Sequence, residues 1–151
     1  MQTSSAIRPY TFGEEVCNCA IHGLGIIFSV AGLAVLVSLS SKSGDLWTVA
    51  STAVFGVSMI LLYTASTLYH AVPYPRVKKV LKKFDHIAIY YLIAGSYTPF
   101  LLVNMRGPVG WSVFAVIWSL ALIGTVLKIV TSGSGTKLWS ISLYLITISR
   151  P

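Results

Sequence analysis

Long apolar runs constrain the fold of this chain more than any other feature of its sequence. A helix needs roughly 20 mostly apolar residues to cross the hydrocarbon core of a bilayer. Four runs meet that length, and a fifth, which begins near Leu138, is shorter. We therefore predict an all-α integral membrane helix bundle with four full transmembrane helices and an incomplete fifth. The four full spans are expected at Val16–Ser40, Leu46–Val72, Phe84–Val103 and Trp111–Val130.

The composition favours a membrane protein and argues against two other classes. Of the 151 residues, 55% are hydrophobic and only 10% are charged, which is too little charge to cover the surface of a soluble domain. The net charge of +7 could indicate nucleic-acid binding, but the basic residues are confined to short gaps between apolar runs. Cys17 and Cys19 are too few and too close together for a disulfide framework or a metal site, so we interpret them as packing residues.

The distribution of lysine and arginine predicts the orientation in the membrane. The gap after the second run holds five basic residues, whereas the first and third gaps hold Lys42 and Arg106 alone. By the positive-inside rule, the basic gap, the N-terminal segment 1–15 and the link with Lys137 are cytoplasmic, and residues 16–151 form the membrane domain. The expected location is the plasma (inner) membrane, with the lipid bilayer as partner. Two prolines separate this predicted loop from the second run. The five basic residues are Arg76, Lys78, Lys79, Lys82 and Lys83.

Six polar side chains are predicted to converge on the cytoplasmic side. Three of them recur at i, i+3 and i+7 at the start of the first run and therefore share one helix face. Ser66 and His70 share a face at the end of the second run, and Asp85 stands at the start of the third. Ionisable groups inside a membrane segment are costly, which makes them functional candidates by default. The three residues of the first run are Glu15, Asn18 and His22.

Each of these residues also has a purely structural interpretation. Asp85 could cap the N-terminus of the third helix. Ser66 could donate a hydrogen bond to the carbonyl four residues earlier in its own helix. His70 could simply extend to the membrane interface. Glu15 and His22 could pair only to neutralise each other.

A histidine, a carboxylate and a hydroxyl near one another suit a metal-activated water. A hydrolytic zinc site usually takes three protein ligands, keeps one position open and lowers the pKa of its bound water to about 7. Histidine is the natural ligand, and an aspartate beside it can orient the water or accept its proton. The constellation by itself is a weak signal for zinc.

Three strings carry a resemblance to a known family: TFGEEVCNCAIHGLG, ASTLYHAVPYPRVKKVLKKFDHIAIYYLIAGSYTPFLL and GWSVFAVIWSLALIGTVLK. They resemble the bacterial haemolysin III family, related to the adiponectin and progestin receptors and to alkaline ceramidases, from Thr11 to about Leu145. The resemblance implies a seven-helix membrane protein with a cytoplasmic N-terminus. It also implies that His70 is a zinc ligand, that Ser66 is the serine of its S-x-x-x-H motif, and that Asp85 holds the metal-bound water. The implied activity is hydrolysis of a lipid amide.

The sequence departs from the family pattern at its C-terminal end. The family takes two further zinc ligands from an H-x-x-x-H motif in its last helix, and this sequence contains no such motif. The remaining histidines are His22 and His86, and we interpret His86 as structural because it points away from Asp85 on the helix. We expect the chain to be a fragment or a prematurely terminated product that is inactive by itself. A substitute zinc site from His22, His70 and Asp85 is an alternative.

Two classes of function follow from these observations. The parent protein is predicted to be a zinc-dependent hydrolase that acts on membrane lipids at the cytoplasmic leaflet. The alternative is a non-enzymatic protein that perturbs the membrane, as in haemolysis, or maintains its state, and this function would depend on the basic loop. A receptor for an external ligand ranks last, because the predicted external links are short.

Overall fold

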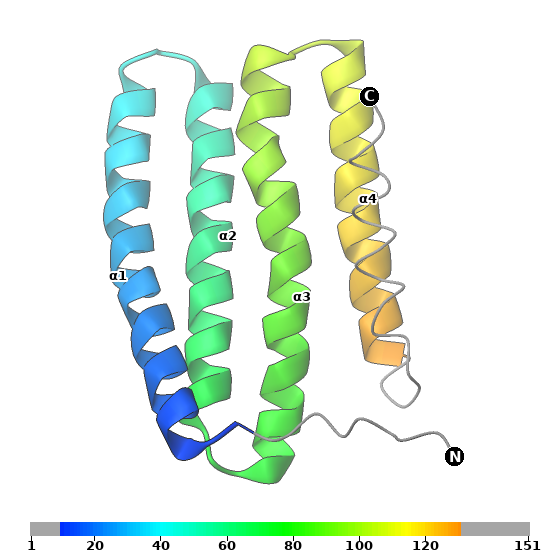
Figure 1. Ribbon diagram of the computed structural model, residues 1–151. Helices are drawn as coiled ribbons and strands as arrows, with labels where there is room; N and C mark the ends of the chain where they lie inside the picture. Colours follow the sequence, from blue (N-terminus) through cyan, green and yellow to red (C-terminus); the bar gives the residue numbers. More distant parts are fainter. Residues whose placement is uncertain (1–9, 131–151) are drawn as a thin grey trace.

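Four long helices stand side by side in chain order in the computed structural model, which describes residues 10–130 (Figure 1). They are α1 (Phe12–Ser41), α2 (Leu46–Ala71), α3 (Pro75–Pro99) and α4 (Pro108–Val130), and a short π-helical segment, η1 (Phe100–Asn104), continues α3. Each neighbouring pair is antiparallel and in contact, so α2 and α3 form the middle of the row. All four helices, α3 together with η1, are long and apolar enough to cross a bilayer. The predicted all-α membrane bundle is confirmed, and the expected fifth span lies outside the described residues.

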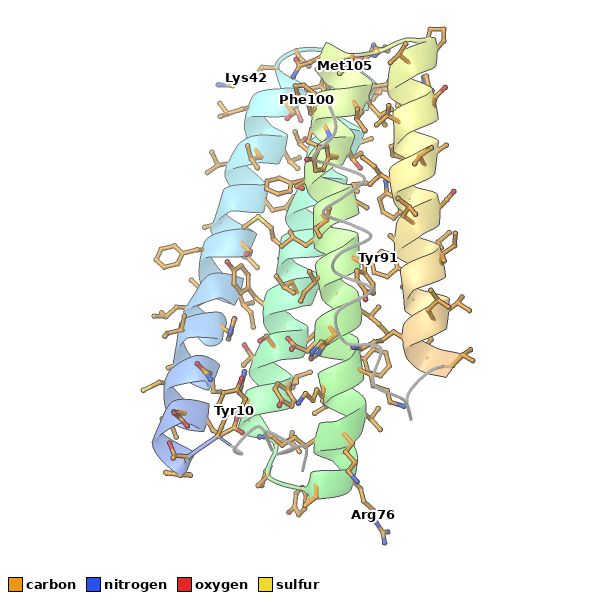
Figure 2. All side chains as sticks on the ribbon, turned by 45° about the vertical axis from the view of Figure 1, so that its right-hand side comes forward. Tyr10, Lys42, Arg76, Tyr91, Phe100 and Met105 are labelled. Atoms are coloured by element: carbon orange, nitrogen blue, oxygen red, sulfur yellow. The ribbon has the colours of Figure 1, made fainter. Side chains whose placement is uncertain are left out.

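The burial pattern is the reverse of that of a soluble bundle. Several of the most buried side chains are small and polar, whereas large apolar side chains such as Phe12, Phe28 and Leu46 are exposed. Figure 2 shows many of these side chains extending outward from the ribbon. Because lipid solvates apolar surface, this arrangement suits a bundle whose helices pack through small residues. The buried hydroxyl side chains are Ser29, Ser40, Ser51, Ser58, Ser66 and Thr98.

Helix α1 begins earlier than the predicted start at Val16. A capping box explains the difference: the Glu14 N–H donates to the Thr11 hydroxyl at 3.3 Å, and the Thr11 N–H donates to the Glu14 carboxylate at 2.7 Å. The helix therefore starts at Phe12, and Glu15 lies in its first turn.

The basic segment 75–83, which we predicted as a loop, is helical. Pro75 occupies the first turn of α3, where its missing N–H costs nothing and its fixed backbone angle suits a helix. The turn between α2 and α3 is therefore only residues 72–74. Asp85 lies well inside α3 rather than at its start, so the interpretation of Asp85 as an N-cap is wrong.

The expected loosening near Pro99 takes the form of a π-helix. Proline has no backbone N–H to donate within a helix, and the hydrogen-bond pattern changes immediately after it. The Met105 N–H then donates to the Phe100 carbonyl at 3.2 Å, which closes the five-residue segment.

Helices α2 and α3 approach closely at Gly95. A Cβ atom placed there would lie 2.8 Å from the Ser58 Cβ, so only glycine permits this distance between the two backbones. Further packing between α3 and α4 surrounds Ala94 and Ala121, which are almost fully buried. These contacts bring the backbone of α3 close to α2 and pack α3 against α4.

The two ends of the bundle carry different polar contacts. We call the end with the 72–74 turn and the start of α1 the Glu15 end, and the end with the other two turns the Asp45 end. Figure 2 shows Tyr10 and Arg76 at the Glu15 end and Lys42 and Met105 at the Asp45 end. At the Asp45 end, Arg106 donates a hydrogen bond to Asp45, which joins the α1–α2 turn to the turn before α4.

The Asp45 carboxylate predicts a measurable acid sensitivity. The hydrogen bond from Arg106, followed by that from the Thr48 hydroxyl, lowers the pKa of Asp45 from 3.8 to about 2. Because the pKa is lower in the folded state, the interaction stabilises the fold above pH 3.8, and its contribution is lost as the pH falls towards about 2. Thermal unfolding of detergent-solubilised protein should therefore show a loss of stability in this range that is smaller in Asp45→Asn.

Asparagine caps a helix about as well as aspartate, so Asp45→Asn removes the charge while keeping an acceptor for the N-terminus of α2. An identical acid-induced loss in the wild type and in Asp45→Asn would contradict this assignment.

Candidate functional site

A single carboxylate links three helices at the Glu15 end. Glu15 Oε2, on α1, lies 2.7 Å from Nδ1 of His70 at the end of α2. Its other oxygen, Oε1, accepts a hydrogen bond of 2.6 Å from the ammonium of Lys78 at the start of α3. The Glu15 side chain is only 17% exposed, so both oxygens of a largely buried charge have partners. This bridge is possible because the short 72–74 turn brings the end of α2 and the start of α3 together.

His70 is enclosed by aromatic rings rather than extended into the interface. Its side chain is 7% exposed, and the rings of Tyr10 and Tyr69 lie 5.6 Å and 4.7 Å from its ring centroid. The ring of His22 stacks on it at 5.8 Å with an interplanar angle of 2°. The interpretation of His70 as a side chain that reaches for the membrane surface is therefore wrong.

His22 lies beside His70 but does not pair with Glu15. Its Nδ1 atom is buried and has no hydrogen-bond partner within residues 10–130. The Glu15 carboxylate instead bonds to His70 and Lys78, so the expected Glu15–His22 neutralising pair does not form. The predicted stripe on α1 is correct in placing both side chains near His70.

Ser66 and Asp85 occupy the same end of the bundle without contacting His70 through a hydrogen bond. Ser66 is buried, and in the described part of the chain its hydroxyl forms no hydrogen bond, so the alternative in which it bonds to its own helix is not observed. The Asp85 side chain is 18% exposed, and its carboxylate lies 3.8 Å from Nδ1 of His86. His86 Nδ1 also lies 2.6 Å from the carbonyl oxygen of Lys82 in its own helix.

Lys78 is the site residue that sequence reasoning missed, because we treated all five basic residues as topological signals. Its spacing gave a usable signal: Lys78, Lys82 and Asp85 recur at i, i+4 and i+7, as residues on one helix face do. The ammonium groups of Lys78 and Lys82 lie 5.2 Å and 6.0 Å from the ring centroid of Tyr69, within cation–π range. This face of α3 is thus turned towards α2.

The described side chains at the Glu15 end do not form a complete metal site. Within residues 10–130, no three histidine, cysteine, aspartate or glutamate side chains lie close enough together to hold a metal ion. The alternative zinc site from His22, His70 and Asp85 is therefore not assembled. One ring nitrogen of His70 contacts a carboxylate, which is a contact that metal-ligating histidines also commonly make.

Comparison with known proteins identifies the family. The sequence profile described as "Haemolysin-III related" matches residues 10–149. This chain belongs to the haemolysin III-related family. It is 49% identical over 116 residues to "Hemolysin-3" of Bacillus cereus, an alignment that covers 77% of this chain and 53% of that protein. No solved structure gives a significant match.

Two further relatives show the breadth of the family. The "Hemolysin-3 homolog" of Bacillus subtilis (strain 168) is 44% identical over 120 residues, which cover 80% of this chain and 56% of the relative. The human "Monocyte to macrophage differentiation factor" is 30% identical over 118 residues, which cover 75% of this chain and 48% of the relative. The chain thus spans about half the length of the curated relatives that it matches. As a member of this family with four apolar helices, it is a multi-pass membrane protein.

Proposed function

We propose that the protein, at the length of its relatives, is a zinc-dependent hydrolase that acts on an amide bond of a membrane lipid. The observation that carries this proposal is the environment of His70. Its imidazole is buried near the end of α2, and its Nδ1 atom lies 2.7 Å from the Glu15 carboxylate. A histidine held in this way is suited to metal binding through its other nitrogen. The S-x-x-x-H and F-D-H strings resemble the haemolysin III pattern, and this resemblance also implies that His70 is a zinc ligand.

The chain supplies one zinc ligand in this proposal, and the remaining ligands come from beyond the matched half of the relatives. Zinc, when bound, supplies the Lewis-acid chemistry that activates water and polarises a carbonyl. Asp85 is proposed to accept a proton. Its side chain is mostly enclosed, and within residues 10–130 its carboxylate has an ion-pair contact with His86 and with no other residue. The buried Ser66 hydroxyl can donate a hydrogen bond to the lipid carbonyl. The 151-residue chain alone is proposed to be inactive.

The proposed reaction takes place at the cytoplasmic side of the plasma (inner) membrane. The first turns of α3 carry five basic residues at the Glu15 end, whereas the described turns at the other end carry Lys42 and Arg106. Such an excess of lysine and arginine marks the cytoplasmic side. The N-terminus of α1 then faces the cytoplasm, and the lipid substrate approaches from the inner leaflet.

Metal content tests the role of His70. The purified full-length protein should hold zinc close to one ion per chain, and His70→Ala should lose it. His86→Ala is the matched control, because the His86 ring bonds within its own helix and should leave the zinc content unchanged. With a lipid amide as substrate, His70→Ala and Asp85→Asn should each lower fatty-acid release by about 100-fold or more. Equal zinc content in the wild type and in His70→Ala would refute the proposal.

A second candidate function, perturbation of the bilayer, is supported by the outward surface of α3. Arg76 and Lys79 are exposed and have no ion-pair partner within residues 10–130, and Figure 2 shows Arg76 extending away from the bundle. The neighbouring face of the same turns exposes apolar side chains. Basic and apolar faces side by side are typical of helices that lie in an anionic membrane interface. The exposed apolar residues are Val77, Val80 and Phe84.

Dye release from vesicles that contain anionic lipid separates the two functions. If the second function holds, the double variant Arg76→Gln/Lys79→Gln should release less dye than the wild type, whereas His70→Ala should release as much. Each single variant, Arg76→Gln or Lys79→Gln, has a charge-matched control in Lys42→Gln, which removes one positive charge at the opposite end of the bundle. Unchanged dye release from the double variant would exclude a role for this surface.

A further inference from the structure

The protonation pattern of His70 follows from the two partners of Glu15. The Lys78 ammonium donates to Glu15 Oε1 at 2.6 Å, and a carboxyl group in this position is held in its ionised form. An ionised carboxylate can only accept hydrogen bonds. Because Glu15 Oε2 lies 2.7 Å from His70 Nδ1, that nitrogen must carry the proton that is shared with the carboxylate.

We propose that Glu15 is a positioning residue that fixes His70 in its Nδ1–H tautomer and leaves the lone pair on Nε2. Nε2 of His70 forms no hydrogen bond inside the described range 10–130, so it is the ring atom that remains able to bind a Lewis acid. The tautomer is a property of the described residues alone. Its use in metal binding rests on the proposed function.

The neighbouring rings strengthen this positioning. The His22 ring lies parallel to the His70 ring at 5.8 Å, and Tyr69 and Tyr10 flank it at an angle, which restricts rotation of the imidazole about its bond to Cβ. Lys78 contributes indirectly, because it keeps the carboxylate charged while contacting the face of Tyr69. Glu15 thus acts on His70 from α1, and Lys78 acts on Glu15 from α3.

A purely structural role for Glu15 makes a different prediction. A carboxylate that only joined the helices would stabilise the fold without selecting a tautomer, because Lys78 alone would satisfy its charge. The imidazole of His70 would then sample both neutral tautomers, as it does in water. The tautomer is therefore the readout that separates positioning from simple ion pairing.

The experiment is nitrogen-15 NMR of the 151-residue chain, labelled at its three histidines and measured in lipid nanodiscs without metal at mildly alkaline pH. Assignment of His70 uses His22→Gln and His86→Gln. We expect His70 in the Nδ1–H form in the wild type and a mixture of tautomers in Glu15→Ala. Glu15→Gln should weaken the preference for the Nδ1–H form, because its amide offers one acceptor oxygen, for which Lys78 competes, and an NH2 group that donates. Glu14→Gln, which can keep the capping box, controls for loss of an acidic charge from the first turn of α1 and should not change the tautomer.

An Nε2–H tautomer or a doubly protonated ring in the wild type would overturn the proposal. Because this result comes from the wild-type spectrum, it tests the proposal even if Glu15→Ala fails to fold. An unchanged Nδ1–H signal in a folded Glu15→Ala would also overturn it. In the full-length protein, Glu15→Ala should weaken zinc binding by about 10–100-fold. If the tautomer is as expected but the protein binds no zinc, the proposed function fails and the positioning role stands.

Discussion

The Glu15 carboxylate is the constraint on which the polar end of this bundle depends. Placing a charge at the edge of a membrane segment is costly unless partners replace the lost water. Both partners come from other helices: His70 from the last turn of α2 and Lys78 from the first turn of α3. Their positions require a turn as short as 72–74 and a helix that already begins at Pro75. The helical start of α3, the enclosure of His70 and the proximity of His22 are all consistent with this one interaction.

The two ends of the bundle use ion pairs in different ways. At the Asp45 end, Asp45 and Arg106 join two turns, and their side chains are 33% and 42% exposed. Water partly screens such a pair, so it contributes less to stability than an enclosed pair of the same geometry would. At the Glu15 end the carboxylate is more enclosed, and it contacts a histidine whose second nitrogen remains available for chemistry. Of the two ends as described by residues 10–130, the Glu15 end is the one that combines charge, burial and a histidine nitrogen without a hydrogen-bond partner.

Much of the fold could be predicted from the sequence, because apolar runs of sufficient length leave the backbone few alternatives to helices in a membrane. The location of Glu15 and His70 at one end could also be predicted, since topology alone places the start of the first helix beside the end of the second. The start of α3 was missed because two prolines suggested a break, although proline at a first helical turn is favourable. Lys78 was missed because the positive-inside rule counts lysines without saying where each side chain turns. The roles of Ser66 and Asp85 stay predictions, because neither side chain forms a hydrogen bond to His70 among residues 10–130.

The most direct test of this account is a double-mutant cycle between Glu15 and Lys78. The free energy of unfolding in mixed micelles would be measured for the wild type, Glu15→Gln, Lys78→Gln and the double variant. We expect a coupling energy of about 1 kcal/mol or more, because the two side chains share one hydrogen bond and both are mostly enclosed. Effects of the two substitutions that add to within about 0.3 kcal/mol would contradict the account, because they would show that the carboxylate does not join α1 to α3 through Lys78.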